Sequence, residues 1–271
     1  MRIIENETLK QIETNLLRCF IEICNKQDYR YSICGGTLIG AVRHGGFIPW
    51  DDDIDILMPR TDFERFLIYC KQNDPVFGVM HYSTKAGYCD GILKIYDPNT
   101  IIDDGVTYFY RLGLGIYIDV FPVDGMGNTK KDAIKLYHSS WFSRNVLIPI
   151  KWSRFIPSKT NCIFFEPGRF LFYLISRLTD GNKLIKKMDE KYQKTSFDSC
   201  EYAGSVYGSY KDKEVFPKAY LEEYINLPFE GMEVRAMARY HDYLTHYYGD
   251  YMILPPKEEQ VSHHGFTAYY K

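Results

Sequence analysis

Four carboxylates fall within five residues of this 271-residue chain, at Asp51, Asp52, Asp53 and Asp55. Carboxylates this close repel one another, so the cluster is unfavourable as plain structure. Divalent cations such as Mg2+ and Mn2+ prefer oxygen ligands and would relieve the repulsion. Residues 53–58 alternate acidic and apolar side chains as a half-buried strand does, which directs Asp51, Asp53 and Asp55 to one face. We therefore predict that these three hold one or two Mg2+ or Mn2+ ions, with Asp52 a solvated neighbour off that face.

A fifth carboxylate, Asp119, interrupts the apolar run 117–120. A lone carboxylate in a buried strand is costly without a partner. We predict that Asp119 shares a metal with Asp53 and Asp55. The alternative is an Asp119 paired with a nearby lysine or backbone donor, and the sequence leaves it open.

Gly35 and Gly36 separate a short expected strand at 31–34 from an expected helix at 37–43. Glycine lets backbone N–H groups approach a ligand closely, and a helix N-terminus offers unpaired donors to phosphate. Thr37 would add a hydroxyl group, and Arg43 and Lys94 would add positive charge. Ordinary packing or a surface ion pair is the alternative for Arg43 and Lys94.

Three chemistries use closely spaced aspartates. An EF-hand fits poorly, because Ile56 stands where its loop needs glycine and Asp62 where it needs glutamate. A glycosyltransferase Asp-x-Asp motif would explain the carboxylates but not the two glycines. A polymerase-β-like nucleotidyltransferase combines Gly-Gly before a helix, Asp-apolar-Asp on a strand and one acid on a later strand. All three of its parts are present.

The elements that must position these groups mix helical and extended patterns. We expect helices at 7–26, 37–43, 130–147, 170–178, 182–194 and 237–248. A capping box at Thr61 and Glu64 predicts the start of one more helix. We expect strands at 31–34, 53–58, 76–82, 91–96, 100–103, 115–121 and 203–207, and a hairpin at 224–234. The pattern predicts an α+β fold with a nucleotidyltransferase-like mixed sheet, helices around it and a helical insertion. We divide the chain into a catalytic core at 1–128, a helical region at 129–200, and strands, helix and tail at 201–271 that complete the core.

The middle of the chain is strongly basic. Between residues 130 and 194 there are 14 Lys and Arg against 5 Asp and Glu, a net charge of about +9, which leaves about −11 for the rest. Apolar and basic residues interleave here, which predicts a surface that rests on a membrane or holds a lipid-linked anionic acceptor. Packed helices with solvated basic faces explain the pattern equally well.

Seven cysteines form no Cys-x-x-Cys pair, and the N-terminus lacks the features of a signal peptide. We expect a reduced, cytoplasmic protein that reaches at most the inner face of the membrane, since no apolar run is long enough to span a bilayer. Nothing points to nucleic acid. His263 and His264 are candidates for metal or phosphate binding, although adjacent histidines point in different directions and exposed surface explains them better.

Residues 35–56 read Gly-Gly-Thr-Leu-Ile-Gly-Ala-Val-Arg-His-Gly-Gly-Phe-Ile-Pro-Trp-Asp-Asp-Asp-Ile-Asp-Ile, which resembles the signature of the LicD family. The resemblance continues in 93–97 (Leu-Lys-Ile-Tyr-Asp), 117–125 (Tyr-Ile-Asp-Val-Phe-Pro-Val-Asp-Gly) and 247–256 (Tyr-Tyr-Gly-Asp-Tyr-Met-Ile-Leu-Pro-Pro). It therefore spans most of the chain, whereas 130–215 holds no matching motif.

This resemblance implies a cytoplasmic enzyme that moves phosphocholine from CDP-choline to a hydroxyl of a glycan precursor, of the teichoic acid or lipopolysaccharide type and in some cases lipid-linked. Eukaryotic relatives of the fukutin-related type transfer ribitol phosphate, so other CDP-alcohols, such as those of glycerol and ethanolamine, stay open. Asp53, Asp55 and Asp119 would then be catalytic, and Asp53 or Asp119 would take the hydroxyl proton. A choline headgroup needs aromatic faces, for which Trp50 and Tyr248 are candidates, together with Tyr247 and Tyr251. Nucleotidyl transfer and a non-catalytic binding module for phosphocholine or glycan are the competing functions.

Overall fold

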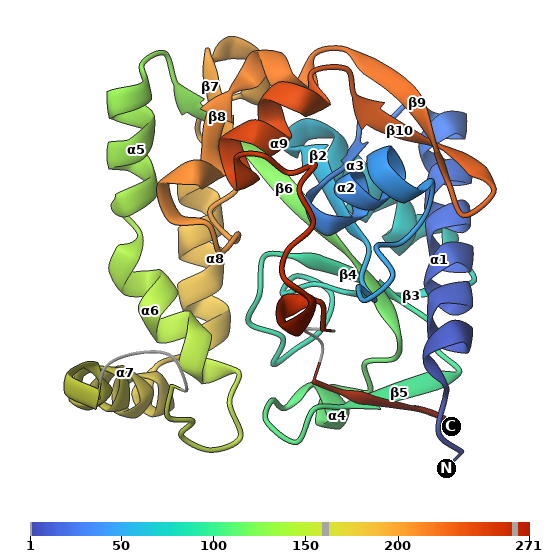
Figure 1. Cartoon of the computed structure of the whole chain (residues 1–271). Coiled ribbons are helices and arrows are strands. Elements are labelled where there is room, and N and C mark those ends of the chain that lie inside the picture. The colour runs from blue at the N-terminus through green and yellow to red at the C-terminus, as the bar shows by residue number, and fades with distance from the viewer. Residues whose placement is uncertain (1, 159–162, 262–264) are drawn as a thin grey trace.

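The computed structural model describes residues 2–158, 163–261 and 265–271, and its largest element is a mixed sheet crossing the centre of the molecule (Figure 1). The strand order is β1-β2-β6-β4-β3, and β7 and β8 continue from the far end of β6. The bounds are β1 Ser32–Ile33, β2 Asp55–Pro59, β3 Gly78–Met80, β4 Leu93–Tyr96, β6 Tyr117–Gly127, β7 Tyr202–Gly204 and β8 Val215–Pro217. The expected mixed sheet with flanking helices is confirmed.

Strand β6 organises this sheet because it is 11 residues long and has three partners. Its first half pairs in parallel with β2 and antiparallel with β4. Its second half pairs antiparallel with β7. The two halves thus join the N-terminal and C-terminal parts of the chain in one sheet. Two small sheets stand apart from it, formed by β9 (Tyr224–Phe229) with β10 (Met232–Met237), and by β5 (Thr100–Asp103) with β11 (Thr267–Tyr270).

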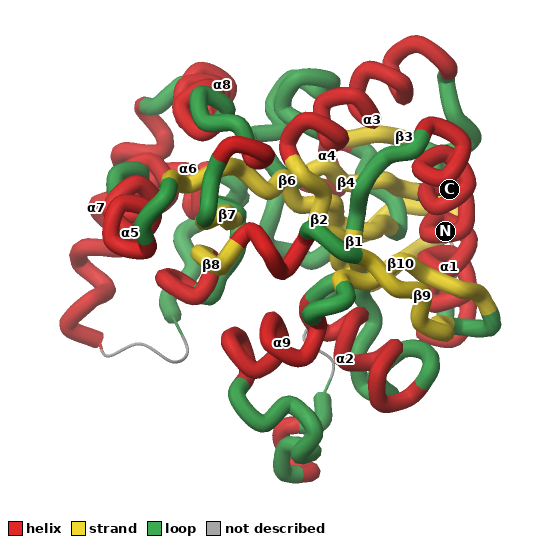
Figure 2. The backbone as a smooth tube through the Cα atoms, turned by 90° about the horizontal axis from the view of Figure 1, so that it is seen from above, coloured by secondary structure: helices red, strands yellow, loops and turns green. Residues whose placement is uncertain are grey.

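Helices surround the sheet, as the view from above shows (Figure 2). Their bounds are α1 Asn6–Gln27, α2 Gly35–His44, α3 Arg60–Asn73, α4 Phe109–Leu112, α5 Lys130–His138, α6 Trp141–Ile150, α7 Glu166–Leu178, α8 Gly181–Tyr192 and α9 Tyr240–Tyr248. Helix α1 stands at one end of the sheet, while α5, α6, α7 and α8 gather at the other end (Figure 1). Both chain termini lie beside β5, where Ile3 pairs with Tyr269 of β11.

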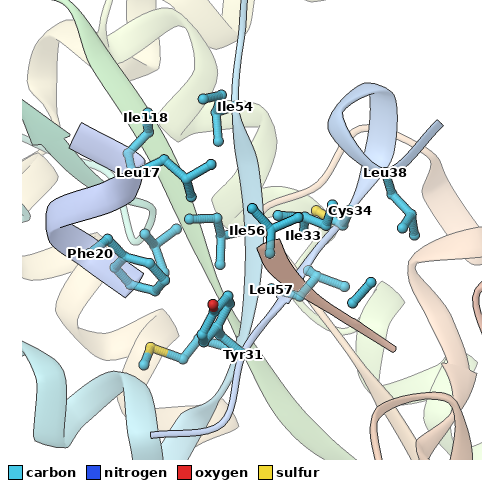
Figure 3. Packing of buried hydrophobic residues seen from close by; sticks show 14 of the residues in the cluster. Leu17, Phe20, Tyr31, Ile33, Cys34, Leu38, Ile54, Ile56, Leu57 and Ile118 are labelled. Carbon is cyan, nitrogen blue, oxygen red and sulfur yellow. The ribbon is translucent and has the colours of Figure 1, made fainter. Parts of the chain in front are cut away.

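The main core lies between α1, α2 and the strands β1, β2 and β6 (Figure 3). Leu17 and Phe20 of α1 are fully buried, as are Ile33, Ile56 and Ile118 from three neighbouring strands. Burial of each such side chain stabilises the fold by roughly 1.5 to 3 kcal/mol. Asp55 and Asp119 lie on these same strands, so the core fixes their backbone.

Residues 129–200 pack on the core through a second apolar cluster and a buried ionic network. Arg60 Nε lies 2.7 Å from Asp124 Oδ1 on β6, and Arg60 Nη2 lies 2.8 Å from Asp189 Oδ1 on α8. Both aspartates are fully buried. The hydroxyl groups of Tyr82 and Tyr207 donate to Asp189 as well. The second apolar cluster joins residues of this region to Cys89 and Met126, which precede it in the chain, and to Val215, which follows it.

Several expected elements have different boundaries. The expected helix at 130–147 is two helices, because Ser139 bonds its hydroxyl to the Leu136 carbonyl and Ser140 leaves the helical conformation. The prediction of a capping box at Thr61 and Glu64 is wrong, because α3 begins at Arg60 and the Glu64 side chain accepts a hydrogen bond from the Arg60 side chain instead. Strands β8 and β11 were not expected; each is short.

Other differences lie near the ends of elements. Helix α2 includes both Gly35 and Gly36, and α9 begins three residues later than expected because 237 still belongs to β10. Thr129 caps α5 through its side chain, as the sequence predicts, and Asp180, in the expected turn between α7 and α8, caps α8. No helix of the described residues is both long and apolar enough to cross a bilayer. The six cysteines within the described residues are free. Cys162, His263 and His264 lie outside them.

Candidate active site

Three charged side chains stand in a row across β2, β6 and β4. The register pairs Asp55 with Asp119 and Asp119 with Lys94. Directly opposed residues point to the same face of a sheet, so the predicted proximity of Asp119 to Asp55 is confirmed. Lys94 Nζ donates to both oxygens of Asp119, at 2.6 and 2.9 Å. The lysine partner that the sequence left open for Asp119 is thus Lys94, which lies over the Tyr117 ring at 3.6 Å from its centroid.

The N-terminus of α2 lies against two of the aspartates. Gly35 has a φ of +56°, and a Cβ placed there would lie 3.3 Å from Asp55 Oδ2 and 3.7 Å from the Tyr248 hydroxyl. A Cβ at Gly36 would collide with the Asp51 carboxylate. The two glycines therefore allow carboxylates to approach the helix N-terminus, where negative charge is favourable. The phosphate contact predicted for this turn stays a prediction.

Thr37 holds the aspartate segment in place from within α2. Its hydroxyl accepts a hydrogen bond from the Asp55 N–H at 2.9 Å and donates to the Asp53 carbonyl at 3.4 Å. These bonds tie residues 53–55 to the helix, while the Ile54 carbonyl accepts a hydrogen bond from the Asp119 N–H on β6. Strand β2 begins at Asp55, so the prediction of a strand from Asp53 is wrong. The Thr37 side chain is buried, so its direct role here is to position this segment.

A cavity of about 340 Å3 collects most of the predicted residues. Of those, Gly35, Gly36, Trp50, Asp51, Asp53, Asp55 and Tyr248 line it. Thr37, Arg43, Lys94 and Asp119 are not among the lining residues. Arg43 donates to the Tyr251 carbonyl at 3.0 Å instead. Tyr247 lines the cavity, whereas Tyr251 is buried elsewhere, with its hydroxyl 3.0 Å from His241 Nδ1.

Negative charges crowd around Asp55. Burial raises the pKa of Asp55 well above its ordinary value, and the charges of Asp53 and Asp119 raise it further, while Lys94 opposes them. The described residues contain no ready-made group of three His, Cys, Asp or Glu side chains that could hold a metal ion. The donor chemistry nevertheless fits a hard divalent cation, because carboxylate oxygens are its preferred ligands and their excess of negative charge would be relieved.

Helix α1 contributes an acid that the sequence analysis missed. Glu13 is 2% exposed, and its Oε2 atom has no hydrogen-bond partner among the described residues. Burial raises the pKa of Glu13 well above its ordinary value, and Asp53 and Asp52 raise it further. The available signal was position, since Glu13 interrupts the buried stripe that Leu9 and Leu16 mark on α1. Asp52 is itself buried, which corrects the prediction of a solvated neighbour.

Residues 205–214 and α9 also line the cavity. Their lining members that the sequence analysis did not identify are Ser205, Gly208, Ser209, Tyr210, Glu214 and Tyr243. Glu214 accepts hydrogen bonds from the Tyr210 N–H at 2.9 Å and from the Tyr247 hydroxyl at 3.1 Å. No periodic pattern marks this loop, and the only sequence signal is the run Tyr-Gly-Ser-Tyr at 207–210.

Comparisons with known proteins identify relatives of this chain. A family model described as LicD/FKTN/FKRP, nucleotidyltransferase domain, matches residues 28–162. The lipopolysaccharide cholinephosphotransferase LicD of Haemophilus influenzae is 34% identical over 271 aligned residues, which cover 94% of each chain. An uncharacterised protein of Rickettsia prowazekii is 42% identical over 134 residues, covering 41% of this chain and 49% of the other. One of Rickettsia typhi is 40% identical over 74 residues, covering 26% and 23%.

Proposed function

The chain belongs to the LicD family of transferases, and we propose that it moves phosphocholine from CDP-choline to a hydroxyl of a cell-surface glycan precursor, releasing CMP. The cholinephosphotransferase from Haemophilus supports the cargo and a lipopolysaccharide-type acceptor. A teichoic acid precursor and a cytoplasmic location belong to the proposal as well. One structural observation supports it most: a single cavity is lined by Asp51, Asp53 and Asp55, its acidic wall, and by Tyr210, Tyr247 and Tyr248.

The proposal assigns the acidic wall to the donor diphosphate. Asp51, Asp53, Asp55 and Asp119 would hold Mg2+ or Mn2+, which when bound neutralises phosphate oxygens as their charge changes during transfer. Gly35 and Gly36 leave room for these carboxylates beside the N-terminus of α2. This arrangement fits the polymerase-β-type nucleotidyltransferase fold, which is part of the proposal.

Proton transfer from the acceptor hydroxyl needs a carboxylate base near the site of attack. Asp53 lines the cavity and is the better placed of the two candidate bases. Asp119 lies behind it on β6, where Lys94 holds both of its oxygens. The ion pair fixes the rotamer of Asp119, so we assign Lys94 to positioning Asp119 instead of to direct contact with the donor.

Release of CMP from CDP-choline by the purified chain, with Mg2+ and a lipopolysaccharide-type acceptor, tests the proposal. Asp53→Asn and Asp55→Asn should each lower the rate by at least about a hundredfold, as loss of a group that acts in the transition state does. Full activity in either variant would contradict the assigned roles. CDP-ribitol, CDP-glycerol and CDP-ethanolamine assayed in parallel test the donor, and preference for any of them would overturn the choline assignment.

A further inference from the structure

We propose that Glu214, with the rings of Tyr210, Tyr247 and Tyr248, forms the site for a quaternary ammonium group, which in CDP-choline is the choline headgroup. This inference rests on the proposed function and deepens it. Quaternary ammonium ions are recognised by aromatic faces, often beside a carboxylate, because they are large cations that cannot donate hydrogen bonds.

The three rings meet at the cavity wall. The Tyr210 ring stands 5.4 Å from that of Tyr247 and 5.3 Å from that of Tyr248, both at 78° between planes. In the cation–π contacts of the described residues, none of the three rings has a protein cation over it. Their faces are therefore not used by the protein's own charges.

Glu214 supplies the negative charge behind these rings. It is buried and forms no ion pair with any described residue. Two hydrogen bonds, from Tyr210 and Tyr247, fix the carboxylate in place. Gly208 makes room for it, because a Cβ there would overlap the Glu214 carboxyl group. A buried carboxylate without a cation is costly, and a bound cation would offset the cost.

A neighbouring polar atom also points to a ligand. The Ser205 hydroxyl lines the same cavity, is 1% exposed and has no hydrogen-bond partner among the described residues. Buried hydroxyl groups are nearly always satisfied, so an unsatisfied one in a cavity marks a place for a polar group of the ligand. The cavity is thus acidic and metal-binding at Asp51, Asp53 and Asp55, and shaped for a cation at Glu214.

Binding measurements separate the headgroup charge from the rest of the donor. Calorimetry with Mg2+ would compare CDP-choline with CDP-glycerol, which carries the same diphosphate and a neutral alcohol. Glu214→Gln keeps the size of the side chain, and should weaken CDP-choline by at least about tenfold while leaving CDP-glycerol unchanged. Tyr210→Leu should weaken only CDP-choline, and Tyr210→Phe should not.

Glu223→Gln is the matched control, since Glu223 is an exposed carboxylate outside the cavity. If Glu214→Gln weakens the binding of both donors equally, or of neither, the headgroup site is overturned. CMP release by the wild-type chain would still uphold the proposed function in that case. Failure of the wild-type chain to bind CDP-choline would overturn both.

An independent observation concerns the outer surface of α6 and α7, and from it we infer that this surface docks on an anionic lipid bilayer. Helix α7 lies at one extremity of the molecule, packed on α6 away from the central sheet (Figure 1). Leu171, Leu174 and Leu178 follow one another at helical spacing and are 56%, 46% and 91% exposed. The exposed apolar side chains of this surface are Trp141, Phe142, Ile148, Phe164, Phe165, Phe170, Leu171, Leu174 and Leu178.

Helix α7 is apolar on its exposed side as well as on the side that packs on α6, where Phe172 contacts Trp141. Two of its arginines donate to backbone carbonyls of the protein, Arg169 to that of Ile156 and Arg177 to those of Pro149 and Trp152. An amphipathic helix with an exposed apolar stripe is typical of a membrane interface.

Charge decides between a bilayer and a second copy of the chain. The described residues of 141–178 contain five Lys and Arg against one Glu, a net charge of +4, and one of the five, Lys151, pairs with Asp90. A groove beside the start of α6 is lined by Lys187, Lys191 and Lys194 together with Glu190. Two copies meeting through this surface would repel each other, whereas anionic lipid headgroups would attract it.

Co-sedimentation with vesicles of phosphatidylglycerol and phosphatidylcholine tests this docking. The wild-type chain should bind, and the double variant Leu174→Glu with Leu178→Glu should bind at least about tenfold more weakly. Val76→Glu is the matched control, because Val76 is 83% exposed in the loop after α3. Absence of vesicle binding, or equal binding by the double variant, would overturn the inference. A dimer that the double variant abolishes, without vesicle binding by the wild type, would assign the surface to a second copy.

Discussion

Glu214 offers a test of whether the cavity carries uncompensated charge. The substitution Glu214→Gln removes the charge of a side chain that is 5% exposed and keeps its volume. Burial raises the pKa of Glu214 from 4.5 to about 7 in the folded chain, although hydrogen bonds from Tyr210 and Tyr247 and the charge of Arg144 act in the opposite direction. Unfolding exposes the carboxyl group to water and restores its ordinary pKa.

The sign of the effect follows from this raised pKa. The fold favours the neutral acid, so the contribution of Glu214 to stability is complete below about pH 4.5 and is lost as the pH rises through about 7. A pKa difference of about 2.5 corresponds to roughly 3 kcal/mol. Glutamine stays neutral throughout. The free energy of unfolding of Glu214→Gln, relative to that of the wild type, should therefore rise by roughly 2 to 3 kcal/mol as the pH is raised from about 4.5 to about 8.

Urea unfolding of both proteins at these two pH values measures the gain. Taking the difference between variant and wild type at each pH cancels the titration of all other groups. Glu223→Gln, at an exposed position, should show no such dependence. An advantage of Glu214→Gln that is the same at both pH values would show that Glu214 is not destabilised by burial, and would remove one support of the headgroup site.

Further predictions concern the rest of the site and its frame. Saturating Mg2+ should raise the free energy of unfolding by about 2.7 kcal/mol at a hundred times its dissociation constant, and EDTA should reverse this; an unchanged melting temperature would contradict metal binding. Gly36→Ala should abolish CMP release because its Cβ meets Asp51, whereas Gly168→Ala has free space and should retain activity. Asp124→Asn should lower the free energy of unfolding by about 3 to 5 kcal/mol, because it breaks a buried ion pair with Arg60. Glu64→Gln removes a more exposed partner of the same arginine and should change that free energy by no more than about 1 kcal/mol. Thr37→Val should cost about 1 to 3 kcal/mol in the same measurement, since it loses two bonds to residues 53–55, and a cost near zero would refute its positioning role.

The amino-acid sequence by itself determined the elements of local character. Amphipathic periodicity predicted α1, alternation and turn residues predicted most strands of the sheet, and a side-chain cap was correctly expected at Thr129. The clustered aspartates identified the acidic wall, because an excess of like charge is visible without any structure. The LicD family likewise followed from contiguous motifs.

Only the tertiary structure decided which distant residues meet. Lys94 holds Asp119 because β4 and β6 are adjacent in the sheet, and the fold buries Glu13 of α1 where the charge of Asp53 raises its pKa. Glu214 and Tyr210 come from a loop with no periodic pattern, and they join the cavity through β7, β8 and the packing of α9. Side-chain burial and pairing are properties of the whole fold, so no local pattern could pair Lys94 with Asp119 or assign Glu214 and Tyr210 to the site.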